Sequence, residues 1–196
     1  MNVMVSNYAS RYFATMNRII SETAVTDKDG KAVGFDDAVA RFAQKVVSSN
    51  AAGGKVMFVG NGGSATIASH MGIDFSKNGK LRATAFNDAA YLTCLGNDLG
   101  YDNVFGFQVN DHANATDVLV AISSSGKSGS ILNAVTAARG KGAHVITLSG
   151  FGADNPLRKM GDLNFHIPSM EYGYVELLHC AICHCALDST MGTATD

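Results

Sequence analysis

The stretch Val118-Leu-Val-Ala-Ile-Ser-Ser-Ser-Gly-Lys-Ser128 joins a short apolar run to a loop of serines, a glycine and a lysine. Four other short apolar runs, at residues 56–59, 83–86, 145–148 and 163–167, are likewise bounded by Gly, Ser, Asn or Asp. Most of the runs are separated by a segment long enough for a crossover helix. Because apolar strands that alternate with helices are typical of parallel sheets covered on both faces, the sequence predicts an α/β fold with a parallel sheet.

Helical periodicity dominates the two ends of the chain. Residues 8–24 and 35–49 place apolar side chains on one side of a helix, and residues 172–187 are a long helix candidate rich in Leu, His and Cys. The stretch Thr26-Asp-Lys-Asp-Gly30, which lies between the first two, predicts a turn. No linker, low-complexity tract or internal repeat divides the chain, so we expect a single domain.

The composition argues against several classes of protein. Apolar residues make up 46% of the 196 and charged residues 16%, which is typical of a compact globular protein. A net charge of −2 argues against a nucleic-acid binder with a broad basic face. No apolar run approaches a membrane span and residues 1–20 show no export signal, so we expect a cytoplasmic protein without a membrane partner. We expect reduced thiols, the last three buried between helices, at Cys94, Cys180, Cys183 and Cys185.

The serine loop has the chemistry of a phosphate site. Its four hydroxyls, its backbone N–H groups and Lys127 suit a phosphate dianion, and it lies between a predicted strand and a predicted helix. Gly126-Lys127-Ser128 also matches the end of a P-loop. The first glycine of that motif is Ala121 here, and no convincing acidic strand for Mg²⁺ follows, so nucleotide hydrolysis is disfavoured.

Two further loops offer ligand contacts. Gly60-Asn-Gly-Gly-Ser64 follows the predicted strand 56–59 and opens a helix, where glycines and the helix amino end favour an anion. With Ala65 it also fits G-x-G-x-x-A loosely, so a dinucleotide site stays open as an alternative, although its acidic partner would be Asp88, later than usual. In Gly96-Asn-Asp-Leu-Gly-Tyr101, the Asn and Asp side chains either cap a helix, which such residues do more often, or bind sugar hydroxyls.

Histidines and carboxylates occur at ligand spacing on two predicted helices. His70 and Asp74 are four residues apart and share a face, although such a pair is more often a surface interaction than a metal site. Glu176 and His184 differ by about 80° around a helix and share a side. Together these four side chains suit Zn²⁺ or another borderline divalent metal.

These strings, in this order, resemble the sugar isomerase (SIS) domain family and, within it, the phosphoheptose isomerase family. They are Val59-Gly-Asn-Gly-Gly-Ser-Ala65, His70-Met-Gly-Ile-Asp74, Gly96-Asn-Asp-Leu-Gly-Tyr101, Ile122-Ser-Ser-Ser-Gly-Lys-Ser128 and Glu176-Leu-Leu-His179 through His184. The resemblance covers residues 35–187. It implies a flavodoxin-like three-layer αβα sandwich with a five-stranded parallel sheet. It also implies an SIS domain at residues 35–190, after an N-terminal helix at residues 1–34 that contributes to oligomer packing.

The resemblance also implies roles for individual residues. One Zn²⁺ would be bound by His70, Asp74, Glu176 and His184, and proton transfer would fall to Asp74 and His184. Substrate contacts would come from the three loops and the metal group, namely Asn61, Gly62, Gly63, Ser64, Asp74, Asn97, Asp98, Ser123, Ser124, Ser125, Ser128 and Glu176. The active sites would lie at subunit contacts of a homotetramer.

The implied reaction converts sedoheptulose 7-phosphate, through an enediol, to D-glycero-D-manno-heptose 7-phosphate for cell-surface glycans such as lipopolysaccharide. This chain departs from the family pattern at Asp74, usually Glu, at Glu176, usually Gln, and at Gly173-Tyr-Val175, usually Ala-Arg-Ile. Those changes motivate an alternative, a non-catalytic sugar-phosphate-binding tetramer that regulates or docks onto a partner.

Overall fold

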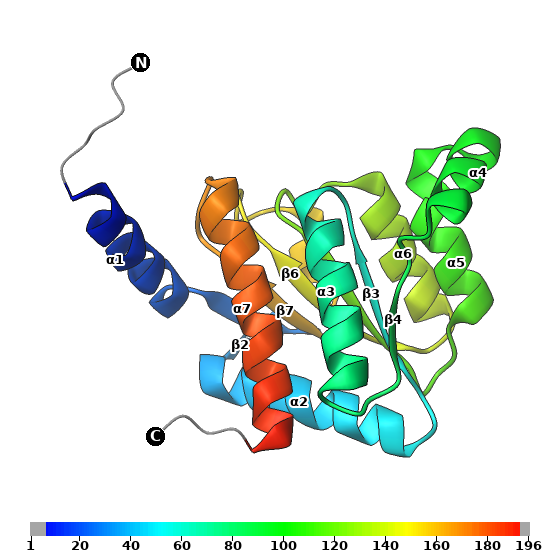
Figure 1. The fold of residues 1–196 in the computed structure, drawn as a ribbon, viewed down its shortest axis with the longest axis horizontal. Coiled ribbons are helices and arrows are strands. Elements are labelled where there is room, and N and C mark those ends of the chain that lie inside the picture. The colour runs from blue at the N-terminus through cyan, green and yellow to red at the C-terminus, as the bar shows by residue number, and fades with distance from the viewer. Residues whose placement is uncertain (1–6, 193–196) are drawn as a thin grey trace.

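The computed structural model describes residues 7–192, and Figure 1 shows a central sheet with helices on both of its faces. The helices are α1 (Tyr8–Ser21), α2 (Phe35–Ala51), α3 (Gly63–Lys77), α4 (Ala89–Leu99), α5 (Val104–His112), α6 (Gly129–Gly140) and α7 (Tyr172–Met191), with short 3₁₀ helices η1 (Tyr101–Asn103) and η2 (Pro156–Lys159). The strands are β1 (Ala24–Asp27), β2 (Ala32–Val33), β3 (Val56–Gly60), β4 (Ala83–Ala85), β5 (Val118–Ser123), β6 (His144–Ser149) and β7 (Leu163–His166).

The predicted three-layer sandwich is confirmed by two separate apolar cores. Val118, Val120 and Ile122 of β5 face a core shared with α2, α3 and α7. Leu119 and Ala121, which alternate with them, face a second core shared with α4, α5 and α6. A strand buried on both faces needs apolar side chains at every position, which is why the predicted strands read as short unbroken runs.

The sheet order is β2-β1-β7-β6-β5-β3-β4, and the five strands from β7 to β4 are parallel, as expected. The expected total of five strands is wrong, because β1 and β2 add an antiparallel hairpin beside β7 and the sheet of the described residues has seven strands. The predicted turn closes this hairpin, where Asp27 Oδ1 accepts the N–H groups of Asp29 and Lys31 at 2.9 Å.

The hairpin also changes the N-terminal part of the predicted domain division. The helix predicted over residues 8–24 ends at Ser21, and residues 24–33 belong to the same sheet as the rest of the chain. Figure 1 shows α1 projecting away from the sandwich, although Ile19 in its last turn is buried in the core. Residues 1–6 of the predicted N-terminal segment lie outside the described residues.

The strand register brings the two predicted ligand loops together. Gly60, the last residue of β3, pairs with Ile122 near the end of β5, so the glycine loop and the serine loop open at the same edge of the sheet. Ligands of open parallel sheets bind beyond this carboxyl edge. Among the described residues, no helix combines the length and the apolar character that crossing a membrane would require.

Candidate functional site

The serine loop after β5 faces a cavity of about 120 Å³ at the carboxyl edge of the sheet. The loop turns at Gly126, which has a φ of 61°, and Ser128 immediately precedes α6. The cavity lining comes from both loops, β5 and α7, namely Asn61, Ser64, Ile122, Ser123, Ser124, Ser125, Ser128, Tyr172 and Glu176. Since the amino ends of α3 and α6 contribute to this lining, the partial positive charge of two helix ends favours an anion here.

The loop hydroxyls differ in what they already bind. Ser123 Oγ accepts the N–H of Gly126 at 3.2 Å, and Ser125 Oγ accepts that of Lys127 at 3.2 Å. Ser124 Oγ is buried and has no hydrogen-bond partner within residues 7–192. Because buried polar atoms are nearly always hydrogen-bonded, a bound oxygen would satisfy this hydroxyl. The loop therefore has the form of a phosphate cradle, with Ser124 as a donor that the protein itself leaves unused.

Asn155, which the sequence analysis missed, supports the serine loop from behind. Its side chain is fully buried, and Nδ2 donates to the carbonyl oxygens of Gly150 at 3.2 Å and Gly152 at 2.9 Å. A Cβ added to Gly126 would collide with Asn155 Oδ1. The backbone N–H of Gly150 also donates to the carbonyl of Ser124 at 3.0 Å. Residues 150–157 thus fix the conformation of the serine loop.

Asn61 of the glycine loop lines the cavity, but both ends of its amide are engaged. Its Nδ2 donates to Ser130 Oγ at 2.9 Å, and its Oδ1 accepts the hydroxyl of Tyr101 at 2.7 Å. This amide therefore ties the glycine loop to α6 and η1. Tyr101 ends the third predicted loop, and no local sequence pattern indicates its contact with a residue forty positions away.

The third predicted loop is not brought to the cavity within this chain. Asn97 and Asp98 lie in the last turn of α4, are exposed and bind each other, with Asn97 Nδ2 donating to Asp98 Oδ1 at 2.8 Å. Helix capping was the role favoured for these two side chains, but neither of them caps the amino end of a helix in the described residues. Asp88 does so instead, because its Oδ1 accepts the N–H groups of Ala90 at 3.0 Å and Tyr91 at 3.1 Å. This capping role leaves the loose dinucleotide motif without its acidic partner.

His70, Asp74 and His184 converge where α3 and α7 lie side by side, with one ligand atom from each within 4.8 Å of the others. The two Nε2 atoms of the histidines are 3.3 Å apart. Asp74 Oδ2 lies 3.2 Å from His70 Nε2 and 3.9 Å from His184 Nδ1. Asp74 Oδ1 accepts a hydrogen bond from Asn78 Nδ2 at 3.2 Å, which orients the carboxylate so that Oδ2 faces the histidines.

This donor set fits a zinc ion. Tetrahedral zinc with Zn–N distances of about 2.0–2.1 Å separates neighbouring ligand atoms by roughly 3.3–3.4 Å. The Nε2 atoms of His70 and His184 have that separation. Three protein ligands with a fourth position open is the arrangement of catalytic rather than structural zinc sites. Asn78 would then be the outer hydrogen-bond partner that ligating carboxylates commonly have.

Glu176 is not in this group, which corrects the predicted set of four ligands. Its carboxylate lies against Gly63, at the amino end of α3, and it lines the serine-loop cavity. The spacing of Glu176 and His184 in the sequence fixes only the angle between them around α7. Eight residues also advance a helix by about 12 Å, so Glu176 and His184 share a side of α7 but lie two turns apart.

Of the other histidine and cysteine side chains of α7, His179, Cys180 and Cys183 pack into the protein and Cys185 does not. His179 is fully buried, its Nε2 lies 3.1 Å from the carbonyl oxygen of Ser149, and burial lowers its pKa to about 4. Burial also raises the pKa of the Cys183 thiol. The pKa of the half-buried Cys180 is raised by burial and, second, by the charge of Asp74, so this thiol stays protonated beside the donor group. Cys185 is exposed, so the expectation of burial was wrong there.

Comparison with known proteins gives concordant matches. The SIS domain family matches residues 11–150. A phosphoheptose isomerase of Rhodospirillum rubrum is 40% identical over 153 residues, which are 75% of this chain and 81% of the relative. The structure of a phosphoheptose isomerase from Francisella tularensis superposes with a TM-score of 0.81 at 31% identity, covering 97% of this chain and all of the other. The phosphoheptose isomerase GmhA of Neisseria gonorrhoeae gives a TM-score of 0.79 at 30% identity, over 93% and 97% of the two chains. The chain therefore belongs to the phosphoheptose isomerase family of SIS-domain proteins.

Proposed function

We propose that this protein is a phosphoheptose isomerase, which converts sedoheptulose 7-phosphate to D-glycero-D-manno-heptose 7-phosphate. The relatives at 30–40% identity carry that name. The observation that carries the proposal is the placement of two groups along one pair of helices. The amino ends of α3 and α7 line the cavity of the serine loop, and the group of His70, Asp74 and His184 lies further along both helices.

The separation of the two groups suits a seven-carbon substrate. His70 lies six residues beyond Ser64 on α3, which is about 9 Å along the helix, and His184 lies about 12 Å beyond Glu176 on α7. An extended seven-carbon chain with its ester oxygen spans roughly 10 Å, because each C–C bond is about 1.5 Å long. With its phosphate in the serine loop, such a ketose would reach the donor group with its carbonyl end. A five-carbon ketose phosphate is shorter by two bonds.

The reaction moves protons at both carbons and both oxygens of that end, in two stages. A base removes a proton from C1, the electrons of that bond form the C1=C2 bond of an enediol, and the carbonyl oxygen takes a proton. Return of a proton to C2, with loss of the proton on O1, gives the aldose. We assign these transfers to Asp74 and His184, and assign Glu176 to hydrogen bonds with the sugar hydroxyls beside the phosphate. Zinc held by His70, Asp74 and His184 would supply Lewis-acid stabilisation of the developing negative charge.

The proposed assembly is a homotetramer in which α1 packs against neighbouring subunits. Tyr8 and Phe13 are 64% and 62% exposed on α1, which projects from the sandwich (Figure 1). Tyr12 stacks on Tyr174 of α7 with ring centroids 4.5 Å apart, so this side of α1 is held against α7. Exposed aromatic side chains on a projecting helix suit an interface between subunits. We further propose that the enzyme works in the cytoplasm and supplies heptose for cell-surface glycans.

The test is the formation of aldose phosphate from sedoheptulose 7-phosphate by the purified protein with added Zn²⁺. We expect turnover, and we expect His184→Ala to abolish it while inorganic phosphate still binds. Cys185→Ala, an exposed position one residue further along α7, is the matched control and should keep full activity. Sugar-phosphate binding without turnover on any five- to seven-carbon ketose phosphate would instead establish the non-catalytic alternative.

A further inference from the structure

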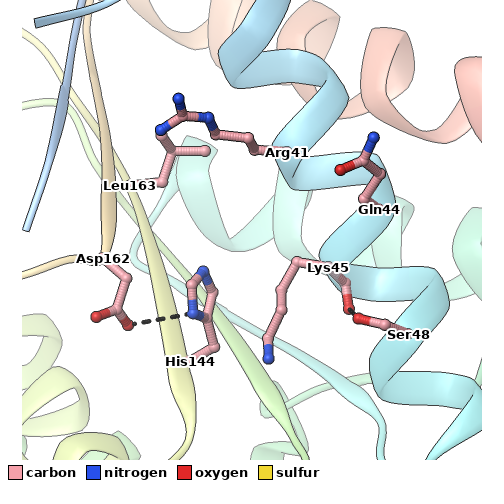
Figure 2. Close-up of a pocket in the computed structure, with 7 residues that line it drawn as sticks. All are labelled: Arg41, Gln44, Lys45, Ser48, His144, Asp162 and Leu163. Carbon is pink, nitrogen blue, oxygen red and sulfur yellow. Dashed lines mark hydrogen bonds and ion pairs between the residues drawn. The ribbon is translucent and has the colours of Figure 1, made fainter.

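A second cavity, of about 500 Å³, lies at the opposite edge of the sheet from the serine loop. Figure 2 shows its lining, which comes from α2 and from the starts of β6 and β7, namely Arg41, Gln44, Lys45, Ser48, His144, Asp162 and Leu163. His144 begins β6, and Ser149 at the other end of β6 pairs with Ser123 of the serine loop. Five residue steps along a strand are about 17 Å, so this cavity is separate from the candidate active site.

Two cations in this cavity have no acidic partner. Arg41 and Lys45 are four residues apart on α2, and neither makes an ion pair within 4.0 Å in the described part of the chain. Asp37 precedes Arg41 by one helical turn, yet the guanidinium lies toward Leu163, across the cavity (Figure 2). Lys45 is only partly exposed. Like charges at this spacing repel each other, so an anion bound in the cavity would stabilise the arrangement.

Asp162, the one acid in the lining, is already engaged. Its Oδ2 accepts the N–H of Val145 at 2.8 Å and lies 3.5 Å from His144 Nδ1, and its Oδ1 lies 3.6 Å from the guanidinium of Arg139. This carboxylate therefore offsets Arg139 rather than Arg41 or Lys45. The cavity keeps a local excess of positive charge although the whole chain has a net charge of −2.

The remaining lining adds hydrogen-bond donors and an apolar wall. Figure 2 shows the second ring nitrogen of His144 directed away from Asp162, and the amide of Gln44 on the other side of α2 from the guanidinium of Arg41. Burial lowers the pKa of His144, and Lys45 and Arg139 lower it further against the opposing effect of Asp162, so the ring adds a neutral donor or acceptor at pH 7. Leu163 is buried at the base of the cavity and offers apolar contact.

We propose that this cavity is a second binding site, and that its ligand is a small organic phosphate. The planar guanidinium of Arg41 matches two oxygens of a phosphate ester, and the ammonium of Lys45, which points toward the other end of the cavity (Figure 2), adds a second positive charge. The volume lies in the range of small-molecule sites, about 300–1,000 Å³, which leaves room for an organic body beside Leu163. This proposal does not depend on the proposed function, because none of the lining residues belongs to the candidate active site.

The test separates the two phosphate sites by substitution. In a Ser124→Ala/Ser128→Ala background, inorganic phosphate, fructose 6-phosphate and AMP are titrated by calorimetry. We expect a residual binding event for at least one of the two organic phosphates, and we expect Arg41→Gln/Lys45→Met to weaken it by more than about tenfold. Lys80→Met/Lys141→Met removes the same charge from two exposed positions outside the cavity and should leave the binding unchanged.

A second measurement places the ligand without the serine-loop substitutions. The imidazole proton resonances of His144 should shift when an organic phosphate is added to the wild-type protein, and Arg41→Gln/Lys45→Met should remove that shift while isomerase activity persists. The proposal is overturned if no organic phosphate binds once the serine loop is altered. It is equally overturned if Arg41→Gln/Lys45→Met and Lys80→Met/Lys141→Met weaken binding by the same factor. The loss would then reflect the net charge of the protein and not a site in the cavity.

Discussion

Substitution of Gly126 by alanine tests whether the serine loop is held rigidly by its support. The residue has a φ of 61°, a left-handed conformation that costs an alanine about 1–2 kcal/mol. The new Cβ would also collide with Asn155 Oδ1. To make room, Asn155 would give up the hydrogen bond from the N–H of Arg158 at 3.1 Å and those it donates to Gly150 and Gly152. At roughly 1 kcal/mol for each bond, the total loss of unfolding free energy is about 4–5 kcal/mol.

Gly53→Ala is the matched control for this substitution. Gly53 has a φ of 78°, and nothing lies within 4 Å of an added Cβ, so only the backbone strain of about 1–2 kcal/mol applies. In urea unfolding, Gly126→Ala should therefore lose about 3 kcal/mol more unfolding free energy than Gly53→Ala, and this difference measures the collision with Asn155. Titration with inorganic phosphate should show weaker binding for Gly126→Ala and unchanged binding for Gly53→Ala.

The double variant Gly126→Ala/Asn155→Gly shows whether Asn155 is the cause. Removal of the Asn155 side chain opens the space that the new methyl group needs, so the two single losses should not add, and the coupling should exceed about 1 kcal/mol. Equal unfolding free energies for Gly126→Ala and Gly53→Ala, together with unchanged phosphate affinity, would refute the rigid support.

Three further substitutions test other contacts. Ser124→Ala should weaken phosphate binding by about 1.5–3 kcal/mol in calorimetric titration, yet leave the urea midpoint unchanged or higher, because it removes a buried hydroxyl without a partner. A lower midpoint would contradict this. Asn78→Ala frees Asp74 Oδ1 and should lower Zn²⁺ affinity about tenfold in a chelator competition, whereas Lys77→Ala should not. The folded pKa of His179 is about 4, below its unfolded value of about 6.5, so its contribution to stability is present above pH 6.5 and is lost as the pH falls toward 4. His179→Gln should therefore lose less unfolding free energy than the wild type between pH 7.5 and pH 5, by up to about 2 kcal/mol.

The parallel strands and the loops that follow them were predictable because their signal is local. An unbroken apolar run is required wherever both faces of a strand are covered, and Val118 to Ile122 meet that requirement without reference to distant residues. The strands β1 and β2 were missed because they are four and two residues long and lie at the sheet edge, with Val25 as their only buried residue. The pairing of β1 with β7 joins residues that lie far apart in the sequence, so no local pattern predicts it.

The site was predictable where one element supplies neighbouring donors, and not where packing brings elements together. His70 and Asp74 share a helix face by spacing alone, and the match of His184 to them depends on how α3 and α7 pack. The misplacement of Glu176 has the same origin, since helical spacing gives an angle and says nothing about which neighbour each turn meets. Asn155 was not predicted because its side chain packs against Gly126, which lies 29 residues earlier in the sequence, and no local pattern indicates that contact.

The stack of Tyr12 on Tyr174 gives α1 a direct mechanical connection to the phosphate cradle. Tyr174 lies in the first turn of α7, between Tyr172 and Glu176, both of which line the cavity. A sideways shift of α1 would therefore tilt that turn and alter the width of the cavity mouth. Contacts that α1 gains or loses, for example with a neighbouring subunit, would therefore change the affinity for sugar phosphate although they involve no ligand-binding side chain.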